Sequence, residues 1–230
     1  MSAPKLGTIT LGQTPRPDLL ELFDEHLPVV LPRLHAGVLD HLGDADITTH
    51  FAPRPREHRM ISRLADGRPV ELDARAAEAG VQRKIVELED AGCTVIVVLS
   101  AAVFRGLRAR RAWLIEPDRF LPALVAGLAG PRRLGILTPL ETAADATRRK
   151  WAALQIPPTV TAASPYADGE AAVVAAAREL KRTGAEVVHM DAIGFVERHR
   201  VAAAAATGLP VLLSSALVAQ ITASCLADAV

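Results

Sequence analysis

An internal repeat is the feature that most constrains the fold of this chain. The segment Leu88–Ser100 reads as a polar helix end, a glycine and an apolar strand, and Leu180–Ala192 repeats that order. Gly184 lies 92 residues after Gly92, at the equivalent point of the repeat. A glycine just past a helix commonly takes the left-handed conformation that ends it. The repeat therefore predicts two halves with similar structures.

Two further pairs of segments support the duplication. Lys5–Thr10 matches Arg133–Thr138 at an offset of 128 residues, and Trp113–Glu116 matches Val211–Ser214 more loosely. The offset falls from 128 to 92 between the first two pairs, so the first half carries about 36 extra residues. We expect the insertion at residues 52–73.

Strands alternate with helical stretches throughout the chain, which predicts parallel sheets with right-handed crossovers. The expected fold is α/β, with two pseudo-symmetric Rossmann-like lobes and a four-stranded, mainly parallel sheet in each. Lobe 1 is predicted over residues 1–130 and lobe 2 over residues 131–230, with a ligand site in the cleft between them. Strands are expected near residues 5–11, 46–51, 94–100 and 112–116 in lobe 1, and near 132–138, 158–163, 186–191 and 210–214 in lobe 2.

The insertion at residues 52–73 has the pattern of a β-hairpin. Two short alternating runs, Arg59–Leu64 and Arg68–Leu72, flank Ala65-Asp66-Gly67, and Asp-Gly is a strong turn signal. Pro69 places the second run at a sheet edge. The preceding Pro53–Arg56 reads as extended and polar. The pattern leaves open whether the hairpin is a lid over the site or a surface loop.

Composition excludes several classes of function. Lys plus Arg and Asp plus Glu both number 26, so the chain has no excess positive charge to bind nucleic acid or a membrane surface. The apolar runs are too short to span a bilayer, and no secretory signal opens the sequence. Two cysteines form no disulfide framework, so we expect a cytoplasmic protein. The histidines and cysteines lack metal-binding spacing, and we expect no metal and no cofactor.

Ligands of parallel α/β sheets bind beyond the carboxyl ends of strands, so candidate residues follow each predicted strand. In lobe 1 the first loop offers Thr10, Gln13, Thr14 and Arg16, whose guanidinium suits a carboxylate. An ordinary strand-to-helix turn is the alternative. The third strand is followed by Ser100 and Ala101, where Ser100 is either a catalytic or binding hydroxyl or a helix N-cap.

Lobe 2 offers an equivalent set of candidates. Asp191 ends an apolar strand, and a buried carboxylate there is expected to have a raised pKa and to act as the acid–base group, unless it caps a helix. Glu141 is either functional or part of a capping box with Thr138. The segment Glu197–Arg200, with His199, is expected to be a charged helix start. The predicted binding residues of this lobe are Thr138, Pro139, Glu141, Ala192, Gly194 and Phe195.

Three segments resemble the AroM family within the aspartate, glutamate and hydantoin racemase superfamily. They are Thr8–Arg16, Glu116–Pro122 and Gly184–Ala216, the last containing Asp191-Ala-Ile-Gly-Phe-Val-Glu-Arg-His-Arg200. The resemblance covers nearly the whole chain. It implies two Rossmann-like lobes related by a pseudo-two-fold axis, a cofactor-independent reaction next to a carboxylate or carbonyl, and a fold compatible with a homodimer.

The resemblance also shows where this chain departs from its superfamily. The racemases place one cysteine after each of two equivalent strands, and those positions here hold Ser100 and Ala192. Cys93 precedes its strand and Cys225 lies in the last helix. We therefore expect proton transfer on a small carboxylate or amino-acid-like substrate, of isomerase or lyase type, without a two-thiol pair. The alternative is a non-catalytic protein that binds or senses a small molecule.

Overall fold

The computed structural model describes residues 4–27, 31–54, 58–167 and 169–226. The chain divides into two compact units, Met1–Pro117 with Val218–Val230, and Asp118–Leu217. The predicted boundary after residue 130 differs from this division. Helix α4 (Pro117–Ala129) belongs almost entirely to the second unit, because its Val125 and Ala129 are buried in a hydrophobic cluster with strands of that unit.

The first unit contains a four-stranded parallel sheet. Its order is β2-β1-β5-β6, and α3 packs against β1, β2 and β5. The strands are β1 (Leu6–Thr10), β2 (Arg33–Gly37), β5 (Val95–Val98) and β6 (Trp113–Ile115). The helices are α1 (Pro17–Asp24), α2 (Asp44–Phe51) and α3 (Ala74–Asp90).

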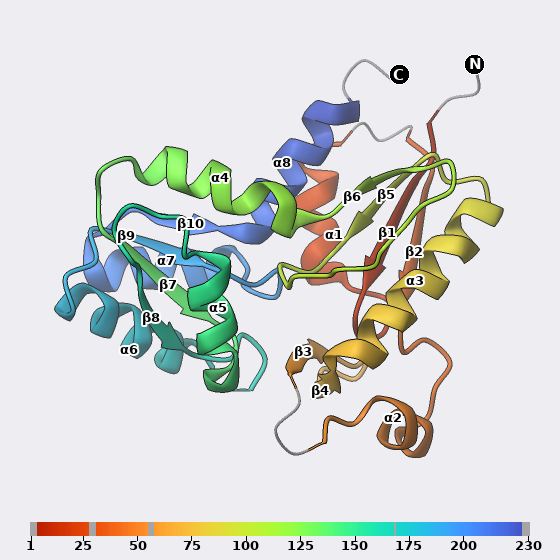
Figure 1. The fold of residues 1–230 in the computed structure, drawn as a ribbon, viewed down its shortest axis with the longest axis horizontal. Coiled ribbons are helices and arrows are strands. Elements are labelled where there is room, and N and C mark those ends of the chain that lie inside the picture. Colours follow the sequence, from red (N-terminus) through yellow and green to blue (C-terminus); the bar gives the residue numbers. More distant parts are fainter. Residues whose placement is uncertain (1–3, 28–30, 55–57, 168, 227–230) are drawn as a thin grey trace. The chain divides into compact units, whose positions relative to one another are not determined.

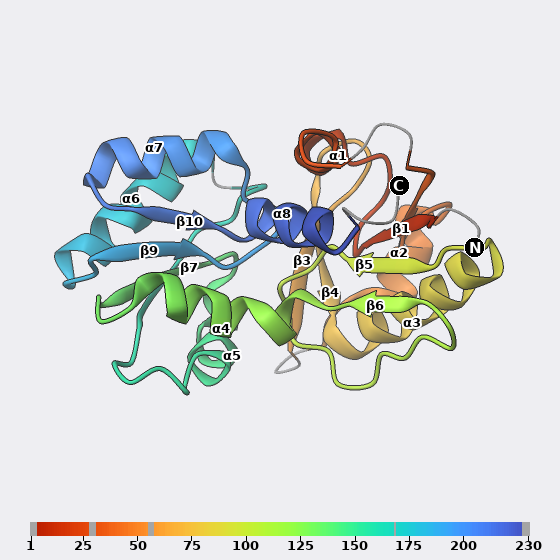
Figure 2. The ribbon, with the colours of Figure 1, turned by 90° about the horizontal axis from the view of Figure 1, so that it is seen from above.

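The second unit contains a parallel sheet of order β10-β9-β7-β8, with α6 and α7 along one face and α4 and α5 along the other (Figures 1 and 2). The strands are β7 (Leu134–Thr138), β8 (Thr159–Ala162), β9 (Val187–Met190) and β10 (Val211–Leu213). The remaining elements are the 3-10 turn η1 (Glu141–Ala143) and helices α5 (Ala144–Lys150), α6 (Gly169–Arg182), α7 (Glu197–Thr207) and α8 (Ser214–Leu226), whose later turns belong to the first unit.

The two sheets confirm the predicted fold class and duplication. In chain order, each sheet runs second strand, first strand, third strand, fourth strand. The same small contacts recur: Gly7 faces Leu88 in the first unit, and Gly135 faces Leu180 in the second. The Lys5 carbonyl accepts a hydrogen bond from the Thr94 backbone N–H, as the Arg133 carbonyl does from Glu186. These equivalences match the offsets of 128 and 92 residues in the sequence.

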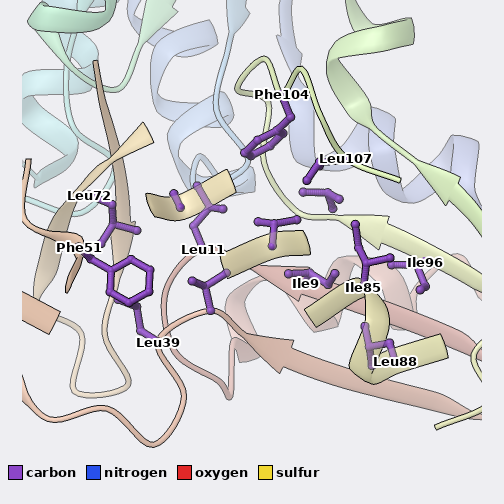
Figure 3. Packing of buried hydrophobic residues seen from close by; sticks show 14 of the residues in the cluster. Ile9, Leu11, Leu39, Phe51, Leu72, Ile85, Leu88, Ile96, Phe104 and Leu107 are labelled. Atoms are coloured by element: carbon purple, nitrogen blue, oxygen red, sulfur yellow. The ribbon is translucent and has the colours of Figure 1, made fainter. Parts of the chain in front are cut away.

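Aliphatic side chains form most of the core of the first unit. Figure 3 shows Ile9, Ile85 and Ile96 in one cluster, with Phe51 near its left end and Phe104 at its upper edge. The three isoleucines are fully buried. A chain with 3% aromatic residues fills its interior in this way, as expected for helices packed on a parallel sheet.

The strand predicted at residues 46–51 is wrong, because this segment forms α2. Its β-branched residues are accommodated in a helix: the Thr48 and Thr49 hydroxyls donate to the carbonyls of Asp44 and Ala45, four residues earlier. Ile47 and Phe51, one turn apart, are buried. The strand in this half is instead β2, in Arg33–Gly37, a polar and only partly buried edge strand.

The predicted hairpin is confirmed, with β3 (Arg59–Arg63) antiparallel to β4 (Pro69–Asp73). It is fastened to the loop after β1 by two hydrogen bonds. The Gln13 N–H donates to the Arg63 carbonyl at 3.1 Å, and the Ala65 N–H donates to Gln13 Oε1 at 3.0 Å. Gly12 lies so close to the Arg63 carbonyl that no Cβ would fit. The predicted extension at 53–56 falls partly on residues 55–57, which lie outside the described residues.

Three further observations concern the described residues only. None of their helices is both long enough and apolar enough to cross a membrane. They contain no cluster of three potential metal-ligating side chains. Cys93 is buried and Cys225 is partly buried, and neither forms a disulfide.

Gly135→Ala is expected to destabilise the chain. The added Cβ would lie 2.7 Å from the Ala185 Cβ and 3.1 Å from the Leu180 Cβ, so the strand and helix would have to shift. Overpacking of this kind costs about 1–3 kcal/mol in the free energy of unfolding, measurable by urea denaturation. Gly127→Ala in α4 is the matched control, because its Cβ would meet nothing within 4 Å and alanine favours a helix. Equal stabilities of the two variants would contradict this account.

Candidate functional site

Asp191 lies at the carboxyl end of β9, the position where ligands of parallel sheets bind. Its backbone N–H donates to the Leu137 carbonyl at 2.9 Å, which continues the pairing between β7 and β9 by one residue. Its side chain is 4% exposed. A carboxylate at this depth requires partners that offset the loss of hydration.

Two adjacent residues at the end of α5 supply those partners. The Lys150 Nζ donates to Asp191 Oδ1 at 2.6 Å, and the Trp151 Nε1–H donates to Oδ2 at 2.9 Å. The Lys150 side chain is only 6% exposed, so the ion pair is buried. Helix α5 therefore ends where it can neutralise the carboxylate and satisfy both of its oxygens.

His189 and Ser214 extend this buried polar cluster. The Ser214 hydroxyl donates to the Met190 carbonyl at 2.8 Å and lies 3.2 Å from His189 Nε2. Because the hydroxyl proton is used on Met190, Nε2 is assigned as the protonated nitrogen that donates to Ser214. Nε2 also lies 3.7 Å from Asp191 Oδ1, which is too long for a good hydrogen bond.

The pKa of Asp191 is lowered, which corrects the expectation of a raised value. Burial by itself would raise this pKa, but the charge of Lys150, the proximity of His189 and the hydrogen bond from Lys150 favour the ionised form more strongly. Asp191 is therefore an anion whose two oxygens are already engaged. A carboxylate with a lowered pKa is a weak proton acceptor. Asp191 therefore serves to hold the Lys150 side chain in place.

Asp118 adds a second carboxyl group to the surroundings of Lys150. It lies in the first turn of α4, and its Oδ1 is buried without a hydrogen-bond partner among the described residues. Burial raises the pKa of Asp118, and the charges of Lys150 and Arg119 only partly oppose that shift. Lys150 thus interacts with two carboxyl groups whose pKa values move in opposite directions.

Sequence reasoning missed both Lys150 and Asp118. The sequence does indicate that a buried Asp191 needs a cation, but Arg148, Arg149 and Lys150 together read as the basic last turn of a helix. Asp118 likewise reads as the acidic first turn of one. The structure shows that the Lys150 side chain is buried, whereas those of Arg148 and Arg149 are exposed, and the sequence alone does not distinguish them.

The other predicted residues of the second unit have structural contacts. The Thr138 hydroxyl accepts a hydrogen bond from Thr147 at 3.2 Å. The predicted capping box with Glu141 does not form, because the N-cap of η1 is Leu140 and no side chain caps it. Glu141 is exposed at the start of η1, and Pro139 and Ala192 are partly buried.

Phe195 is fully buried in the core, where its ring lies edge-on to the His199 ring, and its role in ligand binding stays a prediction. Gly194 packs closely on Tyr166, where a Cβ would not fit. His199 is buried, and its Nδ1 accepts from the Val196 N–H at 3.1 Å, which caps α7. Burial and the nearby Arg198 lower the pKa of His199. Arg200 pairs with Glu197 at the start of α7.

In the first unit, Thr10 and Arg16 lie together: the Arg16 Nη1 donates to the Thr10 hydroxyl at 3.3 Å. Gln13 and Thr14 have internal structural contacts. The Gln13 amide donates to the carbonyls of Leu39 and Leu42, and Thr14 donates twice to Asp40. These bonds fix the loop after β1 to the turn after β2.

No helix begins at Ser100, so its predicted alternative as an N-cap is wrong. Its hydroxyl instead accepts from the Ala102 N–H at 3.2 Å within a turn. Ser100 is 8% exposed and Ala101 is 7% exposed. The segment from residue 99 to Trp113 runs to β6 without a helix.

Asp191→Asn is expected to destabilise the chain by about 3–5 kcal/mol, because it removes the anionic partner of a buried ion pair. The pKa of Asp191 is lower in the folded state than in the unfolded state. Its stabilising contribution is therefore present above about pH 4 and is lost as the pH falls below that value. Urea denaturation between about pH 2 and 7 should show the difference between wild type and variant shrinking at acid pH.

Asp145→Asn is the control for this measurement. Asp145 pairs with Arg148 two residues from Lys150, but its side chain is 80% exposed. Exposed pairs contribute little to stability, so this variant should resemble wild type throughout. A similar loss in both variants, or a loss in Asp191→Asn that does not depend on pH, would contradict the buried-pair account.

Comparison with solved structures shows one fold shared across enzymes of low sequence identity. Unliganded arylmalonate decarboxylase matches with a TM-score of 0.61 and 13% identity, over 98% of this chain and 93% of that chain. Allantoin racemase from Pseudomonas fluorescens matches with a TM-score of 0.58 and 17% identity, over 97% and 90%. A cysteine-to-serine mutant of Nocardia farcinica maleate cis-trans isomerase, carrying a covalently bound succinylcysteine intermediate, matches with a TM-score of 0.56 and 15% identity, over 97% and 93%.

A comparison with curated protein sequences found no match. The model of the AroM protein family, by contrast, matches residues 6–226, nearly the whole chain. The repeated sheet order and the racemase-type fold of the similar structures agree with that match. This chain therefore belongs to the AroM family.

Proposed function

We propose that this AroM-family chain is a cofactor-independent enzyme that transfers a proton next to the carboxyl or carbonyl group of a small carboxylate or amino-acid-like substrate. The reaction is of the isomerase or lyase type. The observation that carries the proposal is the buried Lys150, which is ion-paired with Asp191 at the carboxyl end of β9 and also interacts with Asp118.

Paired titratable groups whose pKa values are pushed apart are typical of acid–base catalysis. Asp191 is held as an anion and fixes the position of the Lys150 Nζ by a hydrogen bond of 2.6 Å. The Lys150 ammonium can then stabilise the negative charge that develops on an enolate-like oxygen. Asp118 has a raised pKa and a buried oxygen without a hydrogen-bond partner among the described residues. It is therefore the group suited to act as the general base, which accepts the proton that the substrate loses.

This assignment changes the role predicted for Asp191 from proton carrier to positioning residue. Ser100 keeps its proposed place as a hydrogen-bond donor, since its oxygen accepts a bond from Ala102 and its proton can be donated. Thr10 and Arg16 remain the proposed carboxylate-binding residues of the first unit, and Gln13 and Thr14 hold their loop in shape.

The similar structures support the reaction class. Their names describe a decarboxylase, a racemase and an isomerase, and the isomerase structure contains a succinylcysteine. This chain has Ser100 and Ala192 at the two equivalent strand ends, so the proposed reaction uses carboxyl and ammonium groups in place of a pair of thiols.

A non-catalytic protein that binds a small carboxylate is the second candidate. The absence of cysteine from positions 100 and 192 is the observation that favours it. Such a protein would keep the fold and the charged groups and would bind its ligand without changing it.

The experiment that separates the two functions is proton exchange in deuterated water. The purified chain is incubated with aspartate, glutamate, allantoin, maleate and phenylmalonate, and each compound is followed by NMR for deuterium uptake, isomerisation or loss of carbon dioxide. We expect turnover of at least one of them. Asp118→Asn, which keeps the size of the side chain, should lower kcat by about 10²–10⁴-fold, the usual contribution of a general acid or base.

Asp145→Asn, which removes one exposed carboxylate from the same unit, is the matched control and should retain full activity. Because a deprotonated Asp118 is required, kcat/KM should fall at acid pH with an apparent pKa above the ordinary value of about 3.9. Binding without conversion of any compound would favour the non-catalytic function. Full activity in Asp118→Asn would remove Asp118 from the mechanism.

A further inference from the structure

Arg16 presents a complete guanidinium fork at the end of β1, and the chain's own Asp18 fills it. Arg16 Nε donates to Asp18 Oδ1 at 2.9 Å, and Arg16 Nη2 donates to Oδ2 at 2.8 Å. Two parallel bonds of this kind are the geometry by which arginine recognises a carboxylate. The remaining Nη1 donates to the Thr10 hydroxyl, which orients the fork.

A second guanidinium approaches the same carboxylate from the hairpin. Arg63 Nη1 lies 3.8 Å from Asp18 Oδ2, and Arg63 Nε is buried without a hydrogen-bond partner among the described residues. A buried donor without an acceptor is costly, and a ligand oxygen would satisfy it.

We propose that Arg16, Arg63 and Thr10 form a binding site for a small carboxylate, and that Asp18 occupies this site until the ligand replaces it. Asp18 is suited to such an exchange because it lies in the first turn of α1 and its side chain is 17% exposed. Arg63 is 31% exposed and provides a route of access to the more deeply buried Arg16. The hairpin thereby contributes a ligand contact, which gives the insertion a role in binding.

The ionisation of Asp18 agrees with this arrangement. Burial would raise its pKa, but its bonds to Arg16 and the charges of Arg16 and Arg63 lower it below the usual value. At neutral pH, Asp18 is therefore an anion that competes directly with a ligand carboxylate. The inference rests on the proposed function in one respect, the choice of a carboxylate as ligand.

The test is binding of propionate to the full-length chain at constant ionic strength, followed by NMR shifts of the Arg16 and Arg63 Nε–H signals. Propionamide, which has the same shape without the charge, is the ligand control. Asp18→Asn removes the competing charge and should tighten propionate binding about tenfold, the effect of about one charge-assisted hydrogen bond. Arg63→Gln should weaken binding by a similar factor.

Asp44→Asn is the matched protein control, because it makes the same change in net charge at another Arg–Asp pair, with the exposed Arg68. It should leave the affinity for propionate unchanged. Equal affinity in Asp18→Asn and Asp44→Asn, or unchanged binding in Arg63→Gln, would overturn the inference. If propionate binds with the expected pattern but no substrate exchanges a proton, the proposed reaction is refuted and this site is not. Proton exchange combined with unaltered binding in the Asp18 and Arg63 variants would refute this site alone.

Discussion

The second unit depends on the buried ion pair between Lys150 and Asp191. Two charges placed at the carboxyl end of β9 must compensate each other, because both side chains are buried. This requirement fixes where α5 ends, and it places the Trp151 indole, itself buried, against the second carboxylate oxygen. In the proposed reaction, this pair holds the Lys150 ammonium near a second carboxyl group, Asp118, which would transfer the proton.

Duplication provided two copies of one scaffold, and the strand ends have since diverged. The segment Val97-Val98-Leu99 of the first unit is apolar, whereas the equivalent His189-Met190-Asp191 carries the polar cluster. The backbone contacts around them are the same in both units: the Leu99 N–H bonds to Ile9 and the Asp191 N–H bonds to Leu137. The first unit instead concentrates its charge on Arg16 and Arg63. The two units therefore place different charged groups on the same backbone framework: arginines in the first unit, and a lysine with carboxylates in the second.

The sequence predicted the fold well because periodicity and repetition survive in the residues that form the sheets. Seven of the eight expected sheet strands formed, and the Asp-Gly turn correctly predicted the hairpin. The failure at residues 46–51 arose because β-branched residues favour strands only when tertiary contacts allow it. The site was harder to predict: Asp191 does follow an apolar strand, but its pKa is lowered and not raised, and Lys150 and Asp118 resemble ordinary helix-end charges. Long-range pairing across about 40 residues leaves no local pattern.

The surroundings of Lys150 drive the pKa values of two carboxyl groups, Asp191 and Asp118, in opposite directions. The direct measurement is a 13C NMR titration of the Asp118 and Asp191 carboxyl carbons in the full chain, assigned with Asp118→Asn and Asp191→Asn. Asp191 should remain ionised down to the acid limit of folding, while Asp118 should titrate above the ordinary value of about 3.9. If Asp191 took up its proton at a higher pH than Asp118, the proposed division of roles would be wrong.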